Sequence, residues 1–163
     1  MNPVRNYRTI GQKKGVSNGV NIKFNHVGMF TKHPKRLLNF YLTKLGFKKE
    51  YQTILPKSVV YSIFKINAEC IMARLTRNSV VLEIFWFRPS GCEEYELKTR
   101  VIGAVGYNHF GLELKDIDKF CNGLKQKFGV KVIRVNRGSH YNCFIQDPDK
   151  NLIEIKQENR LRR

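Results

Sequence analysis

The sequence predicts an α+β protein made of two similar halves, each with one strand, one helix and then further strands. The first observation is an internal repeat, because the chain aligns with itself without a gap at an offset of 83 positions. The matching segments are FNHVGMFTKHPKRLLNFYLTKLGFK, which starts at Phe24, and YNHFGLELKDIDKFCNGLKQKFGVK, which starts at Tyr107. The second observation is that a short strand-like stretch in both segments is followed by apolar residues at helical spacing.

In the first half, we expect a strand at 24–30 and a helix that begins near Pro34, since proline suits the first helical turn. Gly46 ends this helix. Its apolar residues recur at helical spacing: Leu37, Leu38, Tyr41 and Leu45. The strands expected after the helix are 48–53, 59–66, 69–75 and 80–87.

In the second half, a strand at 107–114 precedes a helix whose N-cap is Asp116 and whose end is Gly129. The apolar stripe of this helix is formed by Ile117, Phe120, Leu124 and Phe128. The strands expected after the helix are 131–135, 142–146 and 152–156, with a turn at 147–151. The chain then divides into a basic tail (1–21), a first module (22–90), a linker (91–106), a second module (107–157) and a second basic tail (158–163).

The chain carries a formal net charge of +17, which favours anionic partners. Part of this charge lies in the two tails, but the body is also strongly basic. We therefore expect a small anionic or oxo substrate and disfavour a large cationic ligand. The basic tails leave nucleic acid open as an alternative partner, although no recognised nucleic-acid motif accompanies them.

No apolar run approaches the roughly 20 residues that a membrane-spanning helix needs, and 1–21 lacks the apolar stretch of a signal peptide. We therefore expect no membrane partner and a cytoplasmic protein. The cysteines form no C-x-x-C pair, which indicates neither a zinc knuckle nor a redox motif: they are Cys70, Cys92, Cys121 and Cys143. We expect small, partly buried thiols.

Four polar residues stand in apolar strands. Glu83 lies within VVLEIFWF and Glu154 within LIEI, where a buried carboxylate costs several kcal/mol unless it is paired, protonated or bound to a cation. His26 and His109 lie in the first strand of each half. Taken singly, each glutamate could pair with a basic residue and each histidine could be a hydrogen-bonded core residue.

Taken together, the two halves repeat a histidine on the first strand and a glutamate on the last. Pseudo-twofold packing would bring His26, Glu83, His109 and Glu154 into one cleft. Two imidazoles and two carboxylates suit a divalent first-row ion, namely zinc, nickel, cobalt, iron or manganese.

The segment FNHVGMFTKHPKRLLNFYLTKLGF resembles the opening of glyoxalase-type proteins of the vicinal oxygen chelate superfamily. YNHFGLELKDIDKF is similar to the start of their second half, and QDPDKNLIEI to its end. The resemblance covers about 22–157. It implies two βαβββ modules that form an open, curved mixed sheet around a metal-binding cleft, with His26, Glu83, His109 and Glu154 as the metal ligands. It also implies a homodimer, with the site either within or between chains.

The resemblance further implies a lactoylglutathione lyase-type lyase or isomerase that works through a metal-chelated enediolate, with zinc or nickel as the first choice of ion. Glu154 is then the candidate catalytic base and Glu83 its partner. The chain departs from glyoxalase I at two glutathione contacts, since Phe30 stands where an arginine is usual and Phe87 where an asparagine is usual. These differences predict a substrate other than the glutathione hemithioacetal.

Several relatives of the same fold remain alternatives. A methylmalonyl-CoA epimerase-like enzyme typically has glutamine at the second ligand, which Glu83 disfavours. An extradiol dioxygenase-like enzyme would bind iron through His26, His109 and Glu154, with His140 and Tyr141 as acid/base groups nearby. A fosfomycin-type thiol transferase would suit the basic body, and a bleomycin-resistance-like protein would bind a small ligand without catalysis.

Overall fold

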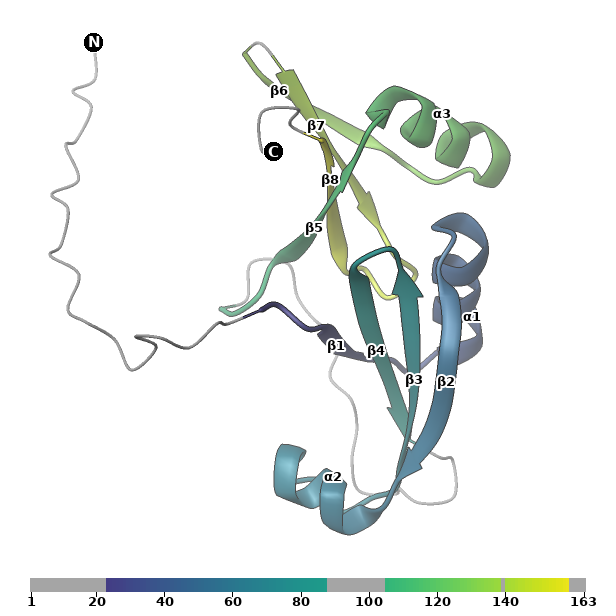
Figure 1. Ribbon diagram of the computed structural model, residues 1–163, viewed down its shortest axis with the longest axis vertical. Coiled ribbons are helices and arrows are strands. Elements are labelled where there is room, and N and C mark those ends of the chain that lie inside the picture. The colour runs from purple at the N-terminus through teal and green to yellow at the C-terminus, as the bar shows by residue number, and fades with distance from the viewer. Residues whose placement is uncertain (1–22, 88–104, 139, 159–163) are drawn as a thin grey trace, which may run out of the picture.

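The computed structural model describes residues 23–87, 105–138 and 140–158, and these residues form two modules of the same topology (Figure 1). Each module contains one open, four-stranded mixed sheet. The first module consists of β1 (Val27–Phe30), α1 (Pro34–Asn39), a π-helical turn η1 (Phe40–Lys44), β2 (Lys48–Leu55), α2 (Lys57–Phe64), β3 (Cys70–Arg77) and β4 (Val80–Phe87). The second consists of β5 (His109–Leu114), α3 (Ile117–Phe128), β6 (Ile133–Arg137), β7 (His140–Gln146) and β8 (Leu152–Gln157).

The strand order repeats between the modules and confirms the predicted α+β fold. The first sheet runs β1-β4-β3-β2 and the second runs β5-β8-β7-β6. In each, the first strand pairs parallel with the last, and the other pairs are antiparallel. The strand that carries each glutamate is therefore central in its sheet. The predicted tail at 1–21, the predicted tail at 158–163 apart from Glu158, and most of the predicted linker lie outside the described residues.

The expected helices form where the sequence places them. Pro34 opens α1, and Gly46 follows η1 with a φ of 69°. Asp116 caps α3 by accepting a hydrogen bond from the Lys119 amide at 2.9 Å, which satisfies one of the free N–H groups at the helix start. Gly129 ends α3 in the left-handed conformation that glycine adopts without steric cost.

The predicted strand at 59–66 is wrong, because residues 59–64 lie in the helix α2. Its β-branched and aromatic residues resemble a strand, and a short apolar run does not separate the two structures. The burial does separate them. Val60 is buried and Phe64, one helical turn later, is half-buried, whereas Ser62 between them is exposed. Lys65 ends the helix in the left-handed conformation.

A single core joins the two modules. It contains the apolar faces of α1, η1 and α3 and one face of each sheet. Fully buried members from the first module are Leu37, Tyr41, Leu45, Leu75, Leu82 and Ile84, and from the second Ile145, Ile153 and Ile155. Each such side chain contributes about 1.5–3 kcal/mol by leaving water. No helix among the described residues is long and apolar enough to cross a bilayer.

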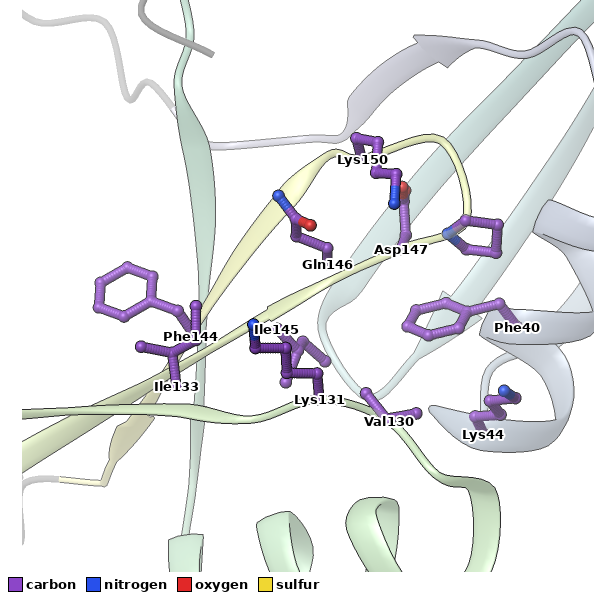
Figure 2. A pocket seen from close by; sticks show the side chains of 11 residues that line it. Phe40, Lys44, Val130, Lys131, Ile133, Phe144, Ile145, Gln146, Asp147 and Lys150 are labelled. Carbon is purple, nitrogen blue, oxygen red and sulfur yellow. The ribbon is translucent and has the colours of Figure 1, made fainter.

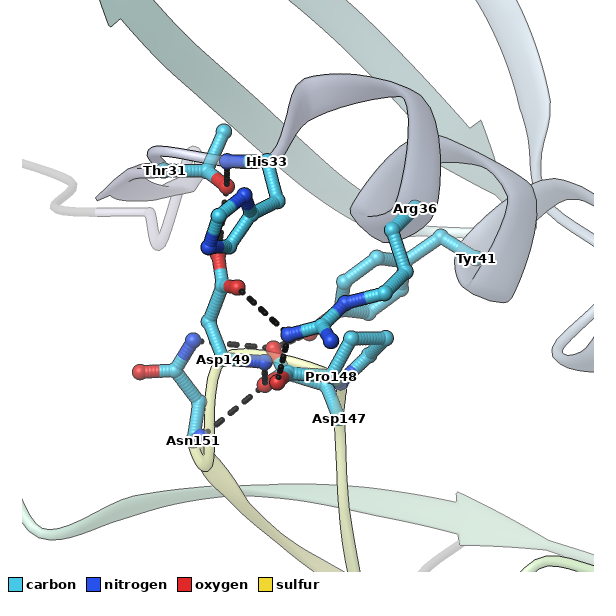
Figure 3. Close-up of polar contacts among 8 residues, drawn as sticks. All are labelled: Thr31, His33, Arg36, Tyr41, Asp147, Pro148, Asp149 and Asn151. Carbon is cyan, nitrogen blue, oxygen red and sulfur yellow. Dashed lines mark hydrogen bonds and ion pairs between the residues drawn. The ribbon is translucent and has the colours of Figure 1, made fainter.

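Polar contacts add to the connection between modules (Figure 3). The turn between β7 and β8 meets the start of the first module. The Tyr41 hydroxyl donates to Asp147 Oδ2 at 2.9 Å, and the Arg36 guanidinium donates to the Pro148 carbonyl at 2.6 Å. The hydroxyl of Thr31 donates to Asp149. The turn predicted at 147–151 is thus present and connects the modules.

Candidate metal-binding site

Equivalent strand positions hold the two glutamates. Glu83 lies on β4, opposite Gly28 of β1 and Arg74 of β3. Glu154 lies on β8, opposite Gly111 of β5 and Phe144 of β7. A Cβ added at Gly111 would lie 3.6 Å from Glu154 Oε2, whereas one at Gly28 would meet the Phe85 ring at 3.3 Å. The side chains of Glu83 and Glu154 are 14% and 8% exposed. Both carboxylates are therefore largely withdrawn from water, as the apolar strands predict.

Each module brings its histidine to its glutamate. His26 Nε2 lies 3.4 Å from Glu83 Oε2, and His109 Nε2 lies 3.6 Å from Glu154 Oε2. His109 is the first residue of β5, whereas His26 lies one residue before β1, since that strand begins later than predicted. The predicted site residues thus form two His/Glu pairs at corresponding places.

The two pairs do not form one cluster. Within the described residues, no group of three or more histidine, cysteine, aspartate or glutamate side chains lies close enough to hold an ion. The structure therefore brings together His26 with Glu83 and His109 with Glu154, as two half-sites. Whether these are the ligands of one ion stays a prediction.

Basic and amide partners of the glutamates were not predicted individually. Arg74 Nη1 lies 2.7 Å from Glu83 Oε1, and Lys156 Nζ lies 2.9 Å from Glu154 Oε2. Asn142 Nδ2 donates to Glu154 Oε1 at 2.8 Å. The sequence contains a signal for Lys156, which lies two residues after Glu154 and so on the same face of the strand. Arg74 and Asn142 are identified only by the pairing of strands.

These partners change the acidity of the site. Burial alone would raise the pKa of Glu154, but Lys156 and Asn142, with a contribution from His109, hold it below the ordinary glutamate value. Desolvation lowers the pKa of Arg74, but hydrogen bonds to Glu83 and Glu50 outweigh it and raise that pKa. Glu154 is thus ionised, a state in which it can ligate an ion but is a weaker base.

Phe30 and Phe87 lie in a second apolar cluster. Their rings are stacked with centroids 5.5 Å apart, and Phe64 of α2 contacts Phe30 edge-on at 4.9 Å. Strand alternation places Phe85 and Phe87 on the face of β4 that carries Glu83. The helix α2 therefore covers one end of that face with apolar side chains.

Tyr141 does not join the site. Its ring lies against the Arg134 guanidinium at 4.0 Å, next to Asp118 of α3. Desolvation raises the pKa of its hydroxyl to about 12. By alternation, Tyr141 and Glu154 point to opposite faces of the second sheet, because the side-chain neighbours of Glu154 are Asn142 and Phe144. Tyr141 is thus not positioned as an acid/base group beside Glu154, and His140 lies at the far end of β7, opposite Arg137.

A pocket of about 320 Å³ lies between η1 and the second sheet (Figure 2). Phe40 and Lys44 line it from the first module, and Lys131, Phe144 and Lys150 from the second. The Phe144 ring also contacts the His109 ring edge-on, with centroids 5.9 Å apart. One side chain therefore borders both this basic, partly aromatic pocket and the second His/Glu pair.

Comparisons with known proteins agree with this duplicated architecture. The model of the Glyoxalase/Bleomycin resistance protein/Dioxygenase superfamily matches residues 23–155, which spans both modules and all four predicted ligands. The chain belongs to this superfamily. Members of the superfamily typically bind divalent metal ions and small molecules, and most are enzymes.

Solved structures of superfamily members share the fold at low identity. A glyoxalase family protein from Bacillus cereus is 15% identical, with a TM-score of 0.66 over 92% of this chain and 99% of that one. The trypanothione-dependent glyoxalase I of Leishmania major is 18% identical, with a TM-score of 0.60 over 85% and 88%. The fosfomycin resistance protein FosX of Listeria monocytogenes is 14% identical, with a TM-score of 0.55 over 82% and 89%. No curated protein matches the chain by sequence.

Proposed function

We propose that the protein is a metal-dependent lyase or isomerase of glyoxalase type, with His26, Glu83, His109 and Glu154 as ligands of one divalent ion. The observation that best supports this proposal is the pair of equivalent His–Glu contacts at 3.4 and 3.6 Å. Two donors bound tetrahedrally to one zinc ion lie about 3.4 Å apart, so each pair fits one edge of a coordination shell. Zinc or nickel is the first choice, and iron, cobalt and manganese accept the same donors.

Assembly of this site requires the two pairs to meet. Either the modules of one chain approach each other, or one pair from each subunit of a homodimer completes the shell. The donor types and the spacing within each pair fit an ion, whereas the basic partners of Glu83 and Glu154 compete with it.

When bound, the ion would supply Lewis-acid polarisation of a substrate oxygen. The carboxylate of Glu154 would take a proton from the carbon next to the polarised carbonyl and return it to the neighbouring carbon. Glu83 would act as its partner across the site. Lys156 lowers the basicity of Glu154, so the Lys156 ammonium group would have to move away from the carboxylate before Glu154 accepts a proton.

The pocket beside Phe144 indicates the substrate class. Lys44, Lys131 and Lys150 outnumber the one carboxylate in its lining, that of Asp147, and none of these lysines makes an ion pair with a described residue. The rings of Phe40 and Phe144 add apolar surface. We infer a small oxo substrate with an anionic group. The glutathione hemithioacetal is disfavoured, because phenylalanines stand at the two positions where glyoxalase I has polar contacts to glutathione.

Metal content tests the proposal directly. Chelator-treated protein reloaded with zinc or nickel should bind about one ion per complete site, and Glu83→Ala should lose it. The matched control is Glu113→Ala, which removes an exposed carboxylate from β5 outside both pairs. Loaded protein is then assayed with methylglyoxal hemithioacetals, acyl-CoA esters and catechols. No bound ion under any loading would refute the metalloenzyme.

A second candidate function has its own supporting observation. Both glutamates have basic partners, which allows the same fold to act as a non-enzymatic small-ligand-binding protein. Ligand binding to metal-free protein without turnover in any assay would favour this function.

A further inference from the structure

Strand register places one basic side chain beside each glutamate. Arg74 lies directly across the antiparallel β3–β4 pair from Glu83, and its Nε also lies 3.0 Å from Glu50 Oε2. Lys156 follows Glu154 by two residues on β8 and points to the same face. The backbone therefore fixes the positions from which both basic side chains reach the carboxylates.

The oxygens of both carboxylates are already occupied. Glu83 uses Oε1 for Arg74 and Oε2 for His26. Glu154 uses Oε1 for Asn142 and Oε2 for Lys156 and His109. An ion at Glu154 Oε2 would share that oxygen with Lys156, and an ion at Glu83 Oε2 would bind a carboxylate whose other oxygen is held by Arg74.

The resident cations also change the charge that an incoming ion meets. Two carboxylates and two neutral imidazoles would present two negative charges, but Arg74 and Lys156 compensate both. Both carboxylates are largely withdrawn from water, whereas Arg74 is 21% and Lys156 44% exposed, so water screens part of this compensation. The attraction for a divalent ion is correspondingly reduced.

We propose that Arg74 and Lys156 are resident counter-cations that neutralise Glu83 and Glu154 in the metal-free protein and compete with the ion for them. The inference rests on the proposed function, because it takes these glutamates as metal ligands. It assigns regulation of the site: metal binding is weak and exchangeable, and the protein stays folded without metal.

The test removes the positive charge of each basic side chain while keeping an unbranched side chain in its place. Arg74→Met and Lys156→Met are compared with two control variants that each remove one positive charge elsewhere. Arg134→Met removes the ion pair that Arg134 makes with Asp118 at 2.6 Å, and Lys125→Met removes a charge from the exposed side of α3. For each full-length, chelator-treated protein, zinc and nickel affinities are measured by calorimetry or against a chromophoric chelator. Melting temperatures are measured with and without the ion.

We expect both site variants to bind the ion at least about tenfold more tightly than wild type, which corresponds to about 1.4 kcal/mol. Without metal, each variant should melt at a lower temperature than wild type, because its carboxylate lacks a counter-charge, and the ion should restore it. Both controls should keep the wild-type affinity. Lys156→Met gives the cleaner readout, because Arg74→Met also removes the partner of Glu50.

The remaining outcomes separate this inference from the proposed function. If wild type binds about one ion and neither site variant binds more tightly, the counter-cation role is refuted and the metal site stands. If only the site variants bind, the counter-cation role is supported and metal catalysis by the natural chain is refuted. If no protein binds an ion, both proposals are refuted.

Discussion

At the scale of single residues, the environment of Glu154 decides what its carboxylate can do. It is buried on the central strand of its sheet and receives hydrogen bonds from Lys156 and Asn142. These donors satisfy the carboxylate that the apolar sequence around it made costly. They also favour its charged form, so a proton-transfer role depends on loosening at least one of them.

Glu154→Gln tests that role, because glutamine keeps an acceptor oxygen for Asn142 but does not take up a proton. We expect turnover on the responsive substrate to fall about a hundredfold or more, with the unfolding transition preserved. Glu113→Gln on β5 is the matched control and should keep wild-type turnover. Metal content is measured alongside, and retained turnover at equal metal content would exclude Glu154 as the base.

At the scale of elements, the helix α2 distinguishes the first module from the second. It is inserted between β2 and β3, whereas β6 and β7 follow each other directly among the described residues. Val60 and Phe64 pack against Phe85 and its neighbours. The helix thereby provides an apolar cover over one end of the face that carries Glu83.

Adjacent valines on α2 provide a matched test of this packing. Val60 is fully buried and Val59 is 38% exposed. Val60→Ala removes two buried methyl groups and should lower the free energy of unfolding by about 2 kcal/mol. Val59→Ala should change it by less than about 0.5 kcal/mol. Urea unfolding measures both, and equal effects would contradict the helical packing.

At the scale of the whole molecule, the turn between β7 and β8 places a buried carboxyl group, that of Asp147, at the contact between the two modules. Asp147 lies between β7 and β8, and Tyr41 of the first module donates to it. Its other donors are the amide of Asp149 and the amide and side chain of Asn151. Desolvation nevertheless raises the pKa of Asp147 above the ordinary aspartate value.

This raised pKa predicts a pH-dependent stability. A carboxyl with a higher pKa in the folded state stabilises the protein fully below its unfolded pKa of about 3.9 and loses that contribution as the pH rises through the folded value. The free energy of unfolding of wild type minus that of Asp147→Asn should therefore decrease from pH 3 to pH 7. Urea titrations at several pH values measure it, and an increase would mean that the hydrogen bonds outweigh the desolvation.

Much of the fold follows from local patterns in the chain. The repeat predicts the shared topology, Asp116 and Gly129 bound α3, and the run VVLEIFWF predicts the limits of β4. These features depend on residues close in sequence, so local propensity and periodicity suffice. The segment at 59–66 is the exception, because its helix depends on burial against a sheet that the local sequence does not show.

The sequence by itself determined the duplication and the four polar residues that require partners. Only the tertiary structure decided which partners they have, because strand register joins residues far apart in the chain. It brings His26 to Glu83 and His109 to Glu154. It also brings Arg74 to Glu83 and Asn142 to Glu154, and no local sequence pattern indicates either contact. An apolar strand sequence indicates that its carboxylate needs a compensating partner. The tertiary structure determines which residue that partner is, because electrostatic interactions depend on distance in space and not on separation in sequence.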